Sequence, residues 1–67
     1  MKVWFNEETD ILYLSLREGI SVDSEEVAED VRVEYDKQGQ IIGVEIHNIT
    51  KMLAKPLARQ LREAVKA

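Results

Sequence analysis

The sequence predicts a small α+β domain, an antiparallel β-meander of about four strands with a C-terminal amphipathic helix packed on one face. Apolar residues recur at every second position through most of residues 1–47, which is the period of a half-buried strand. From residue 48 onward the period becomes helical. At 67 residues the chain is long enough for one domain, with a β-sheet at residues 1–47 and a helical segment at residues 48–67.

Two strands joined by a turn are predicted for the segment VRVEYDKQGQIIGVEI, residues 31–46. Asp and Gly within residues 36–39 are typical of a tight turn. A four-residue loop would place Val33 opposite Ile42, whereas a three-residue loop would place it opposite Gly43. A one-residue slip exchanges the two faces of a strand, so the register that pairs apolar residues is favoured unless a bulge intervenes.

Two earlier strands are predicted at residues 2–5 and 11–16. Both are apolar on both faces, and one helix can cover only one face of a sheet. The side chains left on the second face, Trp4, Ile11 and Tyr13, are therefore the candidate subunit interface. The alternative interpretation is that they are isolated exposed apolar residues, which are common on monomers.

Residues 20–30, ISVDSEEVAED, give a weaker pattern. We interpret them as an irregular edge strand whose acidic side chains discourage pairing between sheet edges. A helical turn from Ser24 to Ala28 is the alternative, because Ser followed by two Glu residues resembles the start of a helix.

The C-terminal segment separates its side chains by type. One face of the predicted helix is apolar and the opposite face is basic; the apolar residues are Ile49, Met52, Leu53, Leu57, Leu61, Ala64 and Val65, and the basic residues are Lys51, Lys55, Arg59, Arg62 and Lys66. Pro56 disfavours helical geometry at the residue before it. We expect one helical turn from Thr50 to Ala54 and then a helix from Pro56, with a single kinked helix as the alternative.

Charge and length limit the partners. Residues 1–46 carry a net charge of −8 and residues 47–67 a net charge of +4. This balance argues against nucleic-acid binding by the whole protein and suits a basic helix lying on its own acidic sheet or on the sheet of a neighbour. With no Cys for a disulfide, so short a chain is expected to be a homo-oligomer, with a dimer favoured. No membrane segment or signal peptide is recognisable, so a cytoplasmic protein is expected.

No catalytic, metal or cofactor motif is present in the sequence. The acidic residues between positions 23 and 30 lack the spacing and glycine of a calcium loop. His47 is the one His, and no Cys or serine elbow accompanies it as a nucleophile. The three glycines are too far apart to cradle a phosphate. The sequence therefore predicts no catalytic residue, no metal and no cofactor, and it does not favour an enzyme.

Two segments together resemble a family of small prokaryotic proteins known as domain of unknown function 2283, over residues 3–50. They are FNEETDILYLSL and EEVAEDVRVEYDKQGQIIGVEIHNIT, in which Asp10-Ile11-Leu12-Tyr13-Leu14, Tyr35-Asp36 with Gly39, and Ile42-Gly43-Val44-Glu45-Ile46 carry the resemblance. The resemblance implies the fold and no established enzyme activity. Some relatives are paired with small toxin-like proteins, which implies an antitoxin-like binding role.

Three functions follow from these observations. The first is a small homo-oligomeric protein–protein interaction module, antitoxin-like in its binding of a protein partner. The second is a small ligand-binding or catalytic oligomer with a site between subunits around His47, Asn48 and Tyr35. The third is nucleic-acid binding through the basic C-terminal helix.

Overall fold

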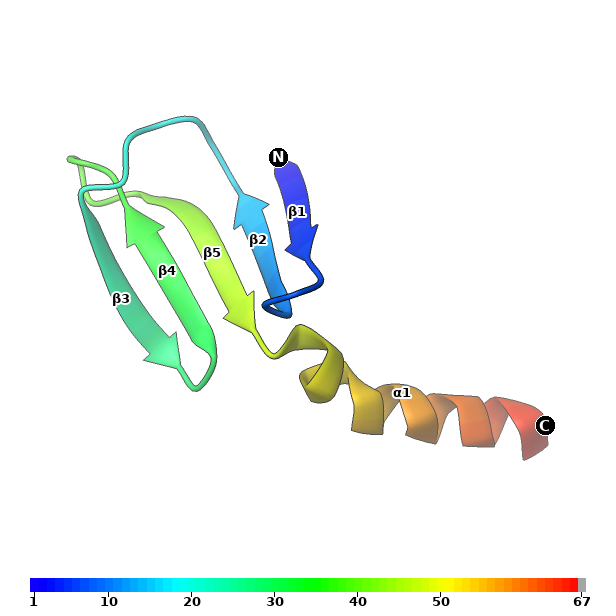
Figure 1. Ribbon diagram of the computed structural model, residues 1–67. Coiled ribbons are helices and arrows are strands. Elements are labelled where there is room, and N and C mark those ends of the chain that lie inside the picture. Colours follow the sequence, from blue (N-terminus) through cyan, green and yellow to red (C-terminus); the bar gives the residue numbers. More distant parts are fainter. Residues whose placement is uncertain (67) are drawn as a thin grey trace.

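The computed structural model describes residues 1–66 and confirms the α+β class, with one antiparallel sheet and one C-terminal helix (Figure 1). The elements, in chain order, are β1 (Lys2–Asn6), β2 (Ile11–Ser15), β3 (Asp23–Ala28), β4 (Val31–Tyr35), β5 (Ile41–His47) and α1 (Ile49–Lys66). The sheet has five strands rather than about four, in the order β1-β2-β5-β4-β3.

This order differs from a continuous meander. The hairpin β1-β2 and the meander β3-β4-β5 are joined by pairing of β2 with β5. Residues 16–22 carry the chain from β2 to the far edge of the sheet, and Leu16 N donates to Ile42 O at 2.9 Å on the way. Val22 N then donates to Tyr35 O at 3.0 Å. β2, which is apolar on both faces, therefore has a neighbouring strand on each edge, β1 on one and β5 on the other.

The acidic segment forms an edge strand, as predicted. β3 pairs only with β4 within the described sheet, and its register shifts between Glu26 and Ala28. Exposed Glu25 and Glu26 on an outer strand, together with this bulge, discourage the addition of another strand.

In the β4-β5 hairpin each face carries the predicted apolar side chains, but the two strands pair in a register that differs from the predicted one. Val33 pairs with Val44, not with Ile42, and Tyr35 pairs with Ile41. The register shifts between Glu34 and Tyr35, and five residues rather than four form the loop. Apolar residues still oppose apolar residues, because the bulge and the longer loop together move the pairing by two residues.

Gly43 makes room for Tyr13 across the sheet. The Tyr13 side chain reaches over Gly43 and donates from Oη to Glu34 Oε1 at 2.8 Å. A Cβ at position 43 would collide with Tyr13 Oη and lie 3.0 Å from Glu34 Oε1. Glycine in the interior of a strand often marks such a close approach.

The helix α1 runs without interruption from Ile49 to Lys66, with Pro56 inside it. The expected break before Pro56 is therefore wrong, and the single-helix alternative is the one observed. Proline here has no amide hydrogen to donate to the carbonyl of Met52, four residues earlier. The helix is not long and apolar enough to cross a membrane.

The predicted packing of the helix on one face of a sheet is not seen within the single chain. α1 extends away from the end of β5, beyond the sheet (Figure 1). The described molecule measures 50 × 21 × 20 Å, with a Cα radius of gyration of 15.1 Å. A compact domain of this length would have a radius of about 11 Å. Both the sheet and the helix therefore keep their apolar surfaces uncovered.

We expect Gly43→Ala to destabilise the fold by about 1–3 kcal/mol, because the new methyl group displaces Tyr13 from Glu34. The measurement is urea unfolding at a fixed chain concentration. In a Tyr13→Ala background the same substitution should be neutral or stabilising, because alanine loses less backbone entropy than glycine on folding. Equal losses in both backgrounds would contradict this account.

Candidate interaction surfaces

One face of the sheet is a continuous apolar surface, here called the apolar face. Cross-strand partners point to the same side of a sheet, and the pairing places apolar residues in two parallel rows. The rows are Val33–Val44–Leu14–Val3 and Val31–Ile46–Leu12–Phe5. At the outer strand β3, Glu25 follows Val33 and gives the first row an acidic end.

This face is only partly covered. Among the described residues the apolar side chains less than a tenth exposed are Val33, Ile42 and Ile49. Val3 is 54% exposed and Phe5 is 48% exposed, and the central positions of the face are half-buried. A sheet that is apolar on one face normally buries that face against another layer.

The second apolar surface lies on α1 and is here called the helix stripe. It consists of Met52, Leu53, Leu57, Leu61 and Val65. These side chains are between 42% and 86% exposed. An amphipathic helix of a globular protein gains most of its stability by burying this stripe.

The base of α1 is joined to the sheet by three residues with positive φ. They are Asp10 before β2, Asp30 before β4 and Asn48 between β5 and α1, with φ of 57°, 64° and 54°. Asp and Asn enter this left-handed region more readily than other residues with a side chain. Each one ends a tight connection at the same end of the sheet.

Asp10 caps the helix from a distant part of the chain. Its main-chain oxygen accepts from Ile49 N at 3.2 Å, and its carboxylate accepts from Thr50 N at 3.2 Å and from Thr50 Oγ1 at 2.7 Å. A carboxylate that accepts these otherwise unpaired amide donors also lies favourably in the field at a helix N-terminus. We call this set of contacts the Asp10 latch.

Asp30 supports the same corner. Asn48 Nδ2 donates to Asp30 Oδ1 at 3.2 Å, and His47 N donates to Asp30 O at 2.7 Å. Ile49 is buried beside these polar contacts. The direction in which α1 leaves the sheet is therefore set by contacts from β2, β4 and β5 together.

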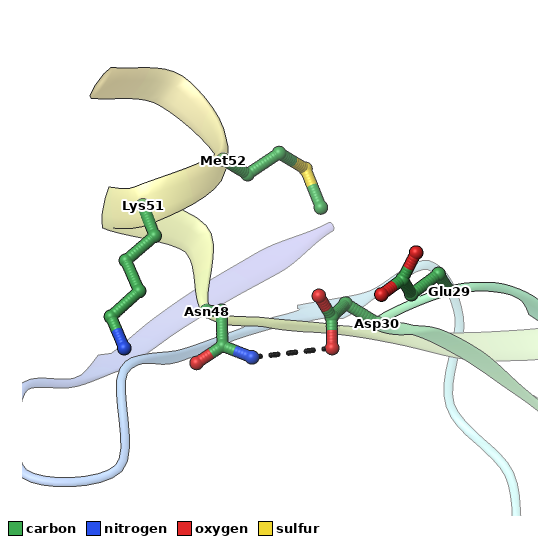
Figure 2. Close-up of a pocket in the computed structure, with 5 residues that line it drawn as sticks. All are labelled: Glu29, Asp30, Asn48, Lys51 and Met52. Carbon is green, nitrogen blue, oxygen red and sulfur yellow. Dashed lines mark hydrogen bonds between the residues drawn. The ribbon is translucent and has the colours of Figure 1, made fainter. Parts of the chain in front are cut away.

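An open pocket of about 440 Å³ lies between this corner and the first turn of α1. Figure 2 shows its lining: two carboxylates on the sheet side, with Asn48, Lys51 and Met52 on the other. The Asp30 carboxylate is already bonded to Asn48. No group of three His, Cys, Asp or Glu residues within residues 1–66 could hold a metal ion.

The three residues of the predicted intersubunit ligand site are not brought together in one chain. His47 and Asn48 lie where β5 ends, and His47 Nε2 is 3.5 Å from Glu45 Oε2. Tyr35 lies at the other end of the hairpin, paired with Ile41, and its Oη donates to Glu25 Oε2 at 3.1 Å. A site that needs all three could form only between subunits, so it stays a prediction.

The predicted interface residues do lie together, on the face opposite the apolar face. Trp4 pairs with Tyr13, and their ring centroids are 5.7 Å apart at an interplanar angle of 45°. Ile11 lies two residues from Tyr13 on the same side of β2. Trp4 is 53% exposed. We call this group the aromatic face; the row continues from Tyr13 through Glu45, Arg32 and Glu26.

Sequence reasoning missed the Asp10 latch. Asp10, Asp30 and Asn48 each stand at the boundary of an element, and each belongs to a residue type that tolerates positive φ. The residue types at these three boundaries were therefore a local sign of positive φ in the sequence. Their convergence at one corner depends on β2 lying beside β5, which the sequence did not predict.

The family described as "Protein of unknown function (DUF2283)" matches residues 2–49 of the chain. The chain belongs to this family. The DUF2283 match spans all five strands and ends at the first residue of α1, so the Asp10 latch lies at its boundary. The searches of curated proteins and of solved structures returned no match. The DUF2283 description assigns no activity, so the function has to be argued from the surfaces.

We expect Asp10→Ala to destabilise the chain by about 1–2 kcal/mol, because it removes the carboxylate that caps α1 and places alanine at positive φ. The measurement is urea unfolding followed by circular dichroism at a fixed chain concentration. Asp10→Asn keeps one side-chain acceptor and the tolerance of positive φ, and should lose less than half as much. Wild-type stability in Asp10→Ala would contradict the latch.

Tyr13 and Tyr35 make the stability of the fold depend on pH in the alkaline range. The hydrogen bond to Glu34, with partial burial and the charges of Glu34 and Glu45, raises the pKa of Tyr13 above its usual 10.0. Desolvation, followed by the hydrogen bond to Glu25, raises the pKa of Tyr35. The folded state thus favours the neutral phenols. Their contribution is fully present below pH 10, where the unfolded phenols are also neutral, and is lost as pH rises through the folded pKa values.

In a Tyr35→Phe background, Tyr13 is the one tyrosine left to titrate. We expect Glu34→Gln to lower the pKa of Tyr13 toward 10, because a neutral amide no longer repels the phenolate. The measurement is the ultraviolet absorbance of tyrosinate across the alkaline range. Glu18→Gln, on an exposed residue outside the strands, is the control and should leave the titration unchanged. Equal titration curves for Glu34→Gln and its parent would contradict the hydrogen bond.

Proposed function

We propose that this DUF2283 chain is a homo-oligomeric protein–protein interaction module. The observation that carries the proposal is a pair of uncovered apolar surfaces in one short chain, the apolar face and the helix stripe. Exposed apolar surfaces of this extent on soluble proteins mark interaction sites or lead to aggregation. Self-association covers both without requiring any other component.

The accessible surface supports this proposal. The chain exposes 5511 Å², whereas a folded monomer of its size would expose about 4300 Å². The excess is about 1200 Å² per copy, so two copies that covered it would bury about 2400 Å², an area found in permanent complexes. A chain of 67 residues with no Cys has few other means of stabilising its fold.

A second protein partner, bound as an antitoxin binds a toxin, is the finer part of the proposal. The aromatic face of Trp4, Ile11 and Tyr13 is the interface that we assign to it. Residues 1–46 carry a net charge of −8, which suits a basic partner. A basic protein that co-purifies from the native host in fixed ratio, and is lost with Trp4→Ala, would support this role. The absence of any partner in fixed ratio would contradict it.

We expect Leu57→Asp to convert the oligomer into a species of lower mass, because it places a charge in the middle of the helix stripe. The measurement is sedimentation velocity at micromolar chain concentration. Ala58→Asp adds the same charge to the next residue, on the basic side of α1, and should leave the mass of the oligomer unchanged. A monomeric wild-type chain under these conditions would overturn the proposal.

A further inference from the structure

We propose that two copies exchange their helices, so that α1 of each copy lies on the apolar face of the other. This inference rests on the proposed function and names the occupant of its surfaces. The helix is held away from its own sheet, it is long enough to cover the apolar face, the charges favour this arrangement over others, and the exchange closes as a dimer.

The connection to α1 keeps the helix from folding back onto its own sheet. One residue, Asn48, separates the end of β5 from the start of α1, and its φ is 54°. The Asp10 latch then holds Ile49 and Thr50 through three hydrogen bonds. Turning the helix back would break these bonds and expose Ile49. The conformation in Figure 1, with α1 pointing away, is therefore fixed at its base.

The dimensions of the two surfaces are compatible. From Met52 to Val65 the helix stripe rises about 20 Å, at about 1.5 Å per residue. The apolar rows cross four strands, whose three gaps span about 14 Å, so the stripe is long enough to cover each row from end to end. A helix laid on the apolar face of a second copy would cover both of its rows. Its stripe would gain the buried environment that its own sheet does not provide.

Charge favours the exchange of helices over two other ways in which two copies could pair. Pairing two helices through their stripes would bring together two segments of net charge +4, and pairing two apolar faces would bring together two segments of net charge −8. Laying a helix on the sheet of another copy pairs opposite signs instead. Glu25 at the end of one row adds an acidic border to the apolar face.

Symmetry lets the exchange close. Each copy has one helix to donate and one face to receive it, so a two-fold axis satisfies both copies and leaves no open end. The aromatic face is on the opposite side of each sheet and stays uncovered. The dimer would therefore carry two identical aromatic faces, which gives the proposed protein partner two equivalent sites.

The absence of Cys from the sequence allows a direct test with engineered thiols. Leu57→Cys lies in the middle of the helix stripe, and Val44→Cys lies in the middle of the apolar face. The two single variants are mixed, unfolded and refolded together, and treated with a short bismaleimide cross-linker. Circular dichroism checks that each variant folds, and mass spectrometry of the digest identifies the linked positions.

The expected result is a link between position 57 of one chain and position 44 of the other in the mixed sample. The matched control replaces Leu57→Cys by Lys55→Cys on the basic side of α1, and its yield should be at least ten times lower. In the double variant Leu57→Cys/Val44→Cys, exchange gives covalent dimers, whereas packing on the same sheet gives cross-linked monomers.

The other outcomes overturn the exchange. Efficient dimers of Leu57→Cys alone indicate pairing of two helices, and dimers of Val44→Cys alone indicate pairing of two sheets. Cross-linked monomers of the double variant indicate packing within one chain. Sedimentation of the same samples separates the two proposals: an oligomer without the link between positions 57 and 44 removes only the exchange, and a monomer removes the proposed function as well.

Discussion

The arrangement of this chain depends on the Asp10 latch at the base of α1. β5 ends at His47, Asn48 turns the backbone at positive φ, and Asp10 accepts the first amide donors of the helix. Because the connection is one residue long, the orientation of the whole helix follows from these few contacts. The helix stripe and the apolar face both remain open for the same reason.

Open apolar surface is the link between this geometry and the proposed function. A larger domain would bury such surface in its own core, but five short strands cannot cover themselves and the helix is held away. In the proposed oligomer, the burial that stabilises the chain comes from another molecule. The division of charge between an acidic sheet and a basic helix is the reason for proposing a second copy of the chain as the complementary partner.

The two faces of the sheet differ in what they can bind. The apolar face is a broad aliphatic surface suited to a helix. The aromatic face is smaller, with the Trp4–Tyr13 pair at one end of a row that continues through Glu45, Arg32 and Glu26. Tyr13 has two roles. It stabilises the sheet by covering Gly43 and donating a hydrogen bond to Glu34, and its ring forms part of the aromatic face.

The sequence by itself determined the α+β class, the family, the acidic edge strand, the two faces of the β4-β5 hairpin and the amphipathic nature of α1. The family follows from the resemblance of two segments, and the other features follow from local patterns, which depend only on side chains a few residues apart. The tertiary structure decided the pairing of β2 with β5, the two-residue change in hairpin register and the direction of the helix. Those features depend on contacts between distant residues, as in the hydrogen bonds from Ile49 and Thr50 to Asp10. Burial demands a cover for the helix but does not say whose sheet supplies it, and the short connection with its latch holds the helix away from its own sheet.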